Sequence, residues 1–248
     1  MIPNKLINSH YGPMIINTND QWIGPSIEQF GSWAADDIEL IKSIVEILLR
    51  DRSQICFYDV GANIGTHTVA LARHFENRIR IRSFEAQRQM YYLLCGNVAL
   101  NGLDNVICEH VAVGDGTAKS IDVLLPDYNK VNNFGGLELI DAINSDNSLM
   151  SKNHTEKVNC VCLDHYNESV DFIKLDIEGM ECQALQGALH TIQNSRPICF
   201  VEVLKSDIVD IQKFFKNLDY IVYKYKPDDW IFVPKERDVE LDLPTVLL

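Results

Sequence analysis

The stretch Cys56–Phe75, CFYDVGANIGTHTVALARHF, runs from an apolar segment through two glycines into a segment with helical spacing. Glycines at positions 61 and 65 let the backbone turn sharply and approach a ligand, so a side chain at Gly61 would enter the ligand's space. The helix that is expected from Gly65 points its free N–H groups at the same place. The sequence therefore predicts a ligand-binding strand–turn–helix unit, with a purely structural turn as the alternative.

Length and charge limit the class of protein. The 248 residues, 46% of them hydrophobic, suffice for one large α/β domain with a small appendage. The net charge of −13 is spread along the chain, which disfavours a phosphate backbone or an anionic membrane surface as partner. We expect no nucleic-acid partner, and the oligomeric state stays open.

The location follows from what the sequence lacks. No run approaches the roughly 18 apolar residues of a membrane span, and no apolar signal segment follows the first residues. The seven cysteines are odd in number and form no CxxC pair, which is typical of free thiols in a reducing compartment. The expected location is the cytoplasm.

From residue 55, apolar strand-like segments alternate regularly with helix-like segments. The strand-like segments are 55–60, 79–85, 106–113, 172–176 and 198–204, and the helix-like segments are 65–75, 87–100, 180–193 and 207–218. Near-continuous apolar strands separated by helices predict a parallel sheet that is covered on both faces. Two stretches break this rhythm: residues 121–155 are polar, and residues 157–163 alternate like an extra strand.

The two ends of the chain add to this pattern. Residues 35–50 have the spacing of an amphipathic helix after a loop or hairpin region, so residues 1–50 are predicted to pack as an extension on a domain of residues 51–248. Near the other end, DYIVYKY and WIFVP are separated only by the turn Lys226–Asp229. This spacing is too short for a helical crossover, so the last strand must be antiparallel. A reversed last strand favours a class I methyltransferase over a dehydrogenase.

The glycine spacing GxxxG limits the ligand. A dinucleotide site would have GxGxxG, with room for a pyrophosphate. A nucleoside-like ligand without a diphosphate fits better, and S-adenosylmethionine is the best candidate. Glu85 ends the next strand beside the end of the strand that carries Asp59, where a carboxylate can accept hydrogen bonds from both ribose hydroxyls. The alternative for Glu85 is a solvated acid at a strand end.

Carboxylates also cluster in DFIKLDIEGMECQALQGA, residues 171–188. Asp176 ends a strand at the topological switch point where open α/β sheets bind ligands. Glu178 and Glu181 follow it, and mutual repulsion can raise the pKa of one of them into a range suited to proton abstraction. We predict a function for Asp176 and Glu178, and helix capping for Glu181.

Five segments in this order resemble the motifs of FkbM-family methyltransferases, between residue 55 and about residue 204. They are FYDVGANIGTHTVALA, FEAQRQMYYLLCGNVALNGLDNV, HVAVGDG, DFIKLDIEGMECQALQGA and RPICFVEV. The resemblance implies a class I, Rossmann-like α/β fold: a seven-stranded, mostly parallel sheet with a reversed last strand and helices on both faces. It also implies S-adenosylmethionine as donor and transfer to a hydroxyl oxygen of a sugar, glycan or natural product. The sequence departs from the family at Ala86, where a proline is usual.

The resemblance further implies the site residues. The cofactor-binding residues would be Asp59, Gly61, Ala62, Asn63, Gly65, Thr68, Glu85, Ala112, Val113 and Asp176. Among them, Glu85 would bind the ribose, and Ala112 and Val113 would line the adenine pocket. Asp176 would lie near the transferring methyl group, and Glu178 would face the acceptor.

Methyl transfer to an alkyl hydroxyl needs a group that takes up the hydroxyl proton. Glu178 or Asp176 can do so directly, or both can hold a divalent metal that lowers the hydroxyl pKa. No histidine accompanies them in the sequence, so we expect no metal. Residues 22–33 and 132–136 are expected to fold over the strand ends and contact the acceptor. An NAD-type oxidoreductase and a non-catalytic binding module of the same fold remain as alternatives.

Overall fold

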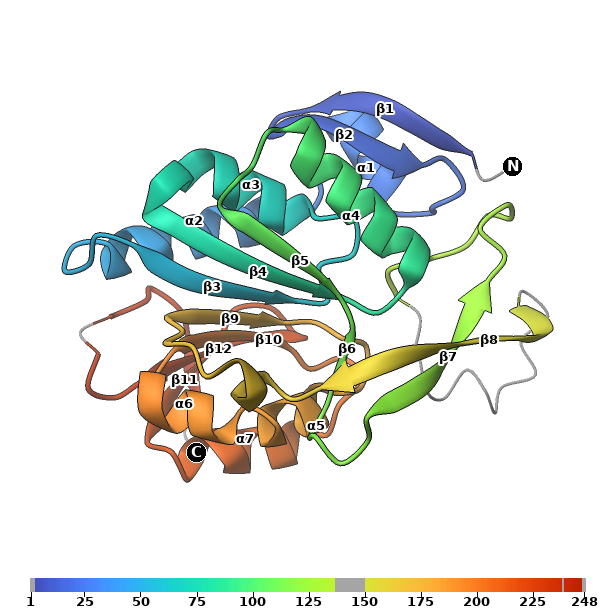
Figure 1. Ribbon diagram of the computed structural model, residues 1–248. Coiled ribbons are helices and arrows are strands. Elements are labelled where there is room, and N and C mark those ends of the chain that lie inside the picture. The colour runs from blue at the N-terminus through green and yellow to red at the C-terminus, as the bar shows by residue number, and fades with distance from the viewer. Residues whose placement is uncertain (1–2, 137–149, 238, 247–248) are drawn as a thin grey trace.

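The computed structural model describes residues 3–136, 150–237 and 239–246. Its centre is a twisted sheet (Figure 1) that has eight strands within the described residues, in the order β5-β4-β3-β9-β10-β12-β11-β13. The strands are β3 Ile55–Val60, β4 Ile79–Glu85, β5 Val106–His110, β9 Phe172–Leu175, β10 Ile198–Glu202, β11 Tyr220–Lys224, β12 Asp229–Pro234 and β13 Thr245–Val246.

The pairing confirms the reversed strand near the C-terminal end. Strands β5, β4, β3, β9 and β10 pair in parallel, whereas β12 runs antiparallel to both β10 and β11. The predicted count of seven is wrong by one strand. The eighth, β13, has only two residues and pairs antiparallel with Val222 and Tyr223 of β11. Two residues are too few to give a strand pattern in the sequence.

Helices cover both faces of this sheet (Figure 1), as predicted. Helices α2 Ala35–Leu48, α3 Thr66–Phe75 and α4 Arg88–Leu100 lie above it as drawn, and α5 Glu181–Gln186, α6 Leu189–Ser195 and α7 Ile208–Lys216 lie below. The helix expected over 180–193 is two helices, α5 and α6. The break falls at Gly187, where an added Cβ atom would overlap the carbonyl of Gly114. This close approach of two backbones explains the interruption.

A second sheet lies beside the first and contains β6 Ala112–Val113, β7 Ser120–Pro126 and β8 Met150–Val161, in the order β6-β8-β7. The strand predicted over 106–113 is therefore two strands in two sheets, β5 and β6, separated at Val111. The extra strand predicted over 157–163 is the end of β8. Within the polar stretch 121–155, residues 121–126 belong to β7, because β8 pairs with them. Much of the rest of that stretch, residues 137–149, lies outside the described residues.

The N-terminal segment packs onto the same core. Strands β1 Asn4–Ser9 and β2 Gly12–Asn17 form a hairpin that is followed by α1 Ile23–Phe30. The buried Asn97 of α4 accepts the backbone N–H of Ile15 and donates to the carbonyls of Ile15 and Ile64. It therefore ties the hairpin to the glycine turn. Helix α2 contributes Val45 to the apolar cluster that also contains Leu71 of α3.

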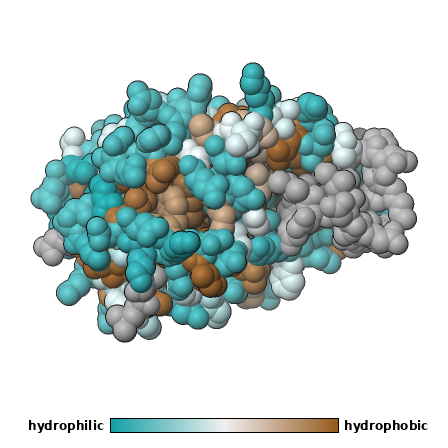
Figure 2. Space-filling view, turned by 90° about the horizontal axis from the view of Figure 1, so that it is seen from below, coloured by the Kyte–Doolittle hydropathy of each residue, from teal (hydrophilic) through white to brown (hydrophobic). Residues whose placement is uncertain are grey.

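Strand β3 is buried along its whole length, with Phe57 in the cluster under α2 and α3 and Tyr58 in the cluster that contains Phe215 of α7. The face seen from below is mostly hydrophilic, with small apolar patches between polar side chains (Figure 2). All seven cysteines are free thiols. Within the described residues, each helix is too short or too polar to cross a membrane.

Candidate active site

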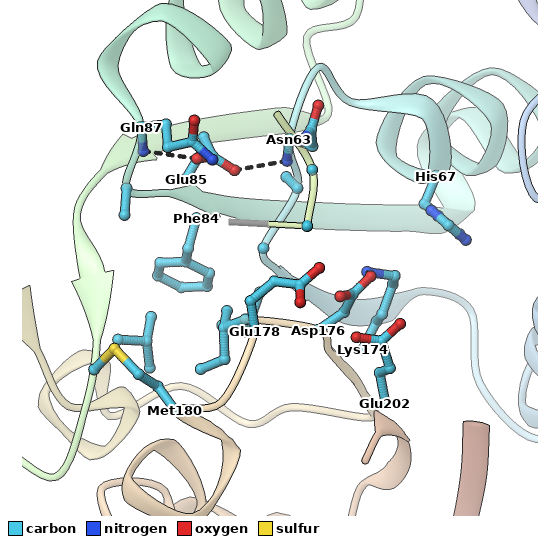
Figure 3. A pocket seen from close by; sticks show the side chains of 18 of the residues that line it. Asn63, His67, Phe84, Glu85, Gln87, Lys174, Asp176, Glu178, Met180 and Glu202 are labelled. Carbon is cyan, nitrogen blue, oxygen red and sulfur yellow. Dashed lines mark hydrogen bonds and ion pairs between the residues drawn. The ribbon is translucent and has the colours of Figure 1, made fainter. Parts of the chain in front are cut away.

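A cavity of about 410 Å³ opens at the carboxyl ends of β3, β4, β9 and β10 (Figure 3). This volume suits an organic ligand of cofactor size. The site residues predicted from the sequence divide into two groups. Those that line the cavity are Gly61, Ala62, Asn63, Glu85, Ala112, Val113, Asp176 and Glu178; those that do not are Asp59, Gly65 and Thr68.

The turn after β3 has an unusual backbone. Gly61, Asn63 and Gly65 all have positive φ angles, of 83°, 50° and 85°. A Cβ atom on Gly61 would overlap the backbone carbonyl of Asp176. A side chain at this position, which was expected to enter the ligand's space, would therefore first push apart the ends of β3 and β9.

Glu85 joins the turns that follow β3 and β4. Its carboxylate accepts the backbone N–H groups of Asn63 (2.8 Å) and Gln87 (2.7 Å), as Figure 3 shows. Burial raises its pKa to about 7, and these two hydrogen bonds only partly offset that rise. Glu85 lines the cavity, and each carboxylate oxygen can accept more than one hydrogen bond, so it can still bind a ligand hydroxyl.

One end of the cavity is apolar. Ala112 and Val113 of β6 line it together with Phe84 and Met180. Figure 3 shows the Phe84 and Met180 side chains on the same side of the carboxylates. A flat heteroaromatic ring fits such a surface.

Three carboxylates meet at the centre of the cavity: Asp176, Glu178 and Glu202. Each offers an oxygen within 4.8 Å of the others. Two lysines lie beside them, with Lys174 Nζ 2.9 Å from Asp176 and Lys205 Nζ 2.8 Å from Glu178. Carboxylate oxygens are the ligands that divalent cations prefer, but ammonium groups already pair with two of these three side chains, Asp176 and Glu178.

The three carboxylates have different pKa values. Burial raises the pKa of Asp176, but the charge and hydrogen bond of Lys174, together with smaller contributions from His67 and Glu202, lower the pKa overall. Burial also raises the pKa of Glu178, and Lys205 offsets part of that rise. For Glu202, burial and the charges of Asp176 and Glu178 raise the pKa to about 9.

Glu178 lies in a tight turn between β9 and α5. Its φ angle is 56°, and Gly179 follows with 104°. Glu181 holds this turn by accepting the backbone N–H groups of Ile177 (2.9 Å) and Gly179 (3.0 Å). Its role is structural, as expected, but it braces the turn before α5 rather than capping the N–H groups of the helix. A strained non-glycine residue that is held in place by its neighbours is typical of functional sites.

Behind the cavity wall lies a buried polar group around Asp59. Thr68 donates to Asp59 (2.6 Å) and lies 2.7 Å from the Ser83 hydroxyl. Lys174 Nζ is 3.8 Å from Asp59, so this lysine links the group to Asp176. Asp59 and Thr68 therefore lie behind the cavity wall and do not line the cavity.

The outer wall of the cavity comes from segments that the sequence predicted to fold over the strand ends. Trp22, Trp33 and Asn133 line it. Lys205 also donates to the carbonyl of Gly136 (2.7 Å), which connects this wall to Glu178.

Sequence reasoning missed several cavity residues: His67, Lys174, Glu202 and Lys205. Lys174 and Glu202 lie within apolar strands, and His67 lies in the first turn of α3. A lysine inside a buried strand is a signal that could have pointed to the paired acids. The other three give no such signal, because only tertiary packing brings them to the cavity.

Comparison with known proteins identifies relatives of this chain. The family described as Methyltransferase FkbM domain matches residues 59–222. Among solved structures, the chain is similar to Methyltransferase FkbM from Methylobacillus flagellatus KT, with 18% identity and a TM-score of 0.51 over 73% of this chain and 43% of that chain. The present chain thus spans less than half of that protein. No curated protein sequence matches it.

Two further solved structures match at lower TM-scores. M. jannaschii TYW2 in complex with AdoMet has 13% identity and a TM-score of 0.44 over 94% of this chain and 84% of that chain. An O-methyltransferase from Thermotoga maritima that is described as SAM-dependent has 12% identity and a TM-score of 0.44 over 96% of this chain and 80% of that chain. At 18% identity, the similarity to the Methylobacillus flagellatus protein shows the fold alone.

Proposed function

Because the chain belongs to the FkbM methyltransferase family, we propose that it transfers a methyl group from S-adenosylmethionine to a hydroxyl oxygen of a sugar, glycan or other small natural product. One observation carries the proposal. A single cavity is lined by Glu85, the candidate ribose-binding residue, and by a cluster of carboxylates in which the pKa of Glu178 is raised. Donor binding and proton removal can therefore take place side by side.

The shape of the cavity supports one orientation of the donor. The apolar end with Phe84 and Met180 suits adenine, and Glu85 suits the ribose hydroxyls. The methionine portion then extends past the glycine turn toward Asp176, whose negative charge attracts the donor's ammonium group. Methyl transfer is an in-line displacement from the sulfonium, so the protein's main task is to align the acceptor oxygen with the methyl group.

Glu178 is the best candidate for the proton acceptor. Asp176 is held by Lys174 with a lowered pKa, which makes its carboxylate a weak base. Glu178 has a raised pKa and projects from a strained turn into the cavity. General base catalysis of this kind typically contributes ~10²- to 10⁴-fold to the rate. The deprotonated hydroxyl oxygen attacks the methyl carbon, and S-adenosylhomocysteine leaves.

A divalent cation on the three carboxylates is the second candidate for activating the hydroxyl. The clustering of oxygens from Asp176, Glu178 and Glu202 favours it. The lysines beside two of these carboxylates favour the metal-free route. Chelation distinguishes the two, because only a metal-assisted reaction is lost in EDTA and restored by Mg²⁺.

The outer wall supports a saccharide as acceptor. Trp22 and Trp33 present aromatic surface at the mouth of the cavity, and Asn133 offers an amide beside them. Aromatic faces flanked by amides suit the C–H faces and hydroxyls of a sugar ring. The net charge of the chain disfavours nucleic acid as acceptor.

The experiment is a transfer assay with donor labelled in the methyl group and a panel of mono- and oligosaccharides, small alcohols and amines. We expect label in a base-stable ether of a saccharide, and its loss in Glu178→Gln. Label only in an amine would contradict oxygen as the acceptor atom. Hydride exchange with NAD in place of methyl transfer would support the oxidoreductase alternative. Tight donor binding without transfer to any class would support a binding module.

A further inference from the structure

The first turn of α3 carries a histidine that the mechanism above does not use. His67 is 8% exposed and lines the cavity. Within the described residues, its Nε2 atom has no hydrogen-bond partner. An unpaired buried polar atom costs free energy, so its partner is expected to be a ligand of the cavity.

The neighbouring backbone points to an anionic ligand. Helix α3 begins at Thr66, and its N-cap is Gly65, which has no side chain to cap the free N–H groups of the first turn. Thr66 also lines the cavity. The N-terminus of a ten-residue helix carries a partial positive charge and attracts anions.

The charges around His67 agree with this. Burial, and after it Lys174, lowers the pKa of His67 to about 3; Lys226 lowers it further, and Asp176 opposes them. The imidazole is therefore neutral near pH 7, where it can donate one N–H to an acceptor. Lys174 and Lys226 are themselves paired with Asp176 and Asp37, so a ligand oxygen here meets a neutral N–H donor rather than a free cation.

The position of His67 in the cavity indicates which anion binds beside it. In Figure 3, Phe84 and Met180 lie on one side of Asp176 and His67 lies on the other. If adenine occupies the apolar end, the opposite end receives the amino-acid part of the donor. This part ends in an ammonium group, which Asp176 attracts, and in a carboxylate.

We propose that His67, together with the uncapped first turn of α3, binds the carboxylate of the donor and so fixes the amino-acid end of the cofactor. This inference rests on the proposed function. His67 is a binding and positioning residue in this account, and the acceptor proton still goes to Glu178.

Calorimetric titration of four proteins with two ligands tests the proposal. The ligands are S-adenosylhomocysteine and its decarboxylated analogue, which keeps the adenosine, the thioether and the amine. The proteins are the wild type, His67→Ala, His67→Gln, which restores an N–H donor, and His74→Ala. His74 is an exposed histidine in the last turn of the same helix and is the matched control.

We expect wild type to bind S-adenosylhomocysteine at least ten times more tightly than the analogue, because a hydrogen bond to a charged group is among the stronger ones. His67→Ala should weaken S-adenosylhomocysteine about tenfold and leave the analogue within twofold. His67→Gln should recover part of the loss, and His74→Ala should match wild type.

Equal affinity of wild type for the two ligands, or an equal loss of both in His67→Ala, would overturn the carboxylate assignment while leaving the proposed function intact. The same holds if His67→Ala binds both normally and only turns over slowly, which would make His67 part of the proton route. Failure of wild type to bind S-adenosylhomocysteine would overturn the proposed function, and this inference with it.

Discussion

Asp176, Glu178 and Glu202 share one cavity, but their neighbours give each a different protonation state. Lys174 keeps Asp176 ionised, whereas burial and the two nearby charges raise the pKa of Glu202 to about 9. Near neutral pH, Glu202 is therefore protonated and cannot accept a proton. Glu178 lies between these extremes, and it is the residue on which the mechanism depends most.

Glu178→Gln tests this assignment at the residue scale. The amide keeps the size of the side chain but cannot accept the proton, so turnover should fall by ~10²-fold or more with cofactor affinity unchanged. Because burial raises the pKa of Glu178, wild-type activity should rise with pH above the ordinary range of a glutamate, and the variant should lose this acidic limb. Normal turnover by Glu178→Gln would show that Glu178 only shapes the turn and does not take the proton.

At the scale of elements, the turn after β3 is fixed by contact between strand ends. Gly61 adopts φ 83°, and its Cα lies against the backbone of Asp176. The turn therefore holds the ends of β3 and β9 together, and this places Asp176 beside the glycine turn.

Gly61→Ala should consequently destabilise the protein, with Gly102→Ala as the matched control. Both glycines have positive φ, but an added Cβ atom at Gly102 meets no atom within 4 Å of its position. The control should lose about 1 kcal/mol from backbone strain alone. Gly61→Ala should lose a further 1–3 kcal/mol or so, because the backbones must separate. Urea unfolding measures both, and equal losses would contradict the contact.

The elements also show how far sequence reasoning reaches. Strands β3 and β4 were predicted to the residue, because β3 is a largely apolar run, β4 alternates apolar and charged residues at first, and both have polar segments before them and turns after them. The single helix over 180–193 was wrong because the break at Gly187 comes from a backbone 73 positions away, at Gly114, which local spacing cannot reveal. β7 was missed because its pairing with β8 decides its conformation.

The site divides in the same way. Asp176, Glu178 and Glu85 were predicted from the sequence because they end strands or follow them at a glycine turn. His67 and Glu202 were not, because each reaches the cavity only through the packing of its helix or strand. That these residues bind the donor or take part in methyl transfer remains a prediction.

At the scale of the whole molecule, a chain of net charge −13 concentrates buried acids at one edge of its sheet. An acid whose pKa is higher in the folded protein than in the unfolded chain stabilises the fold below its ordinary pKa, and this contribution is lost as the pH rises through the folded value. The stabilising contribution of Glu85 is lost as the pH rises to about 7, and that of Glu202 is lost as the pH rises to about 9. The lowered pKa of His67 makes the stability rise with pH instead, but only below the ordinary histidine pKa of 6.5.

The free energy of unfolding of the ligand-free protein should therefore fall between pH 7 and pH 9, by on the order of 1–2 kcal/mol. Urea unfolding at pH 7, 8 and 9 measures this change. In Glu202→Gln the neutral amide cannot ionise, so the slope should be much smaller. A stability that rises over this range in wild type, or an unchanged slope in Glu202→Gln, would contradict the charge assignment for the cavity.

The proposed function depends on the identity of the cofactor, and calorimetric titration of the wild-type protein with S-adenosylhomocysteine and with NAD tests this identity most directly. We predict one S-adenosylhomocysteine per chain and no measurable binding of NAD, since the turn after β3 lacks the third glycine of a dinucleotide site. Glu85→Ala should bind S-adenosylhomocysteine ~10-fold more weakly or worse, because a hydrogen bond to a charged group is worth ~1.5–3 kcal/mol. Binding of NAD with none of S-adenosylhomocysteine, or an unchanged affinity in Glu85→Ala, would contradict the proposed site.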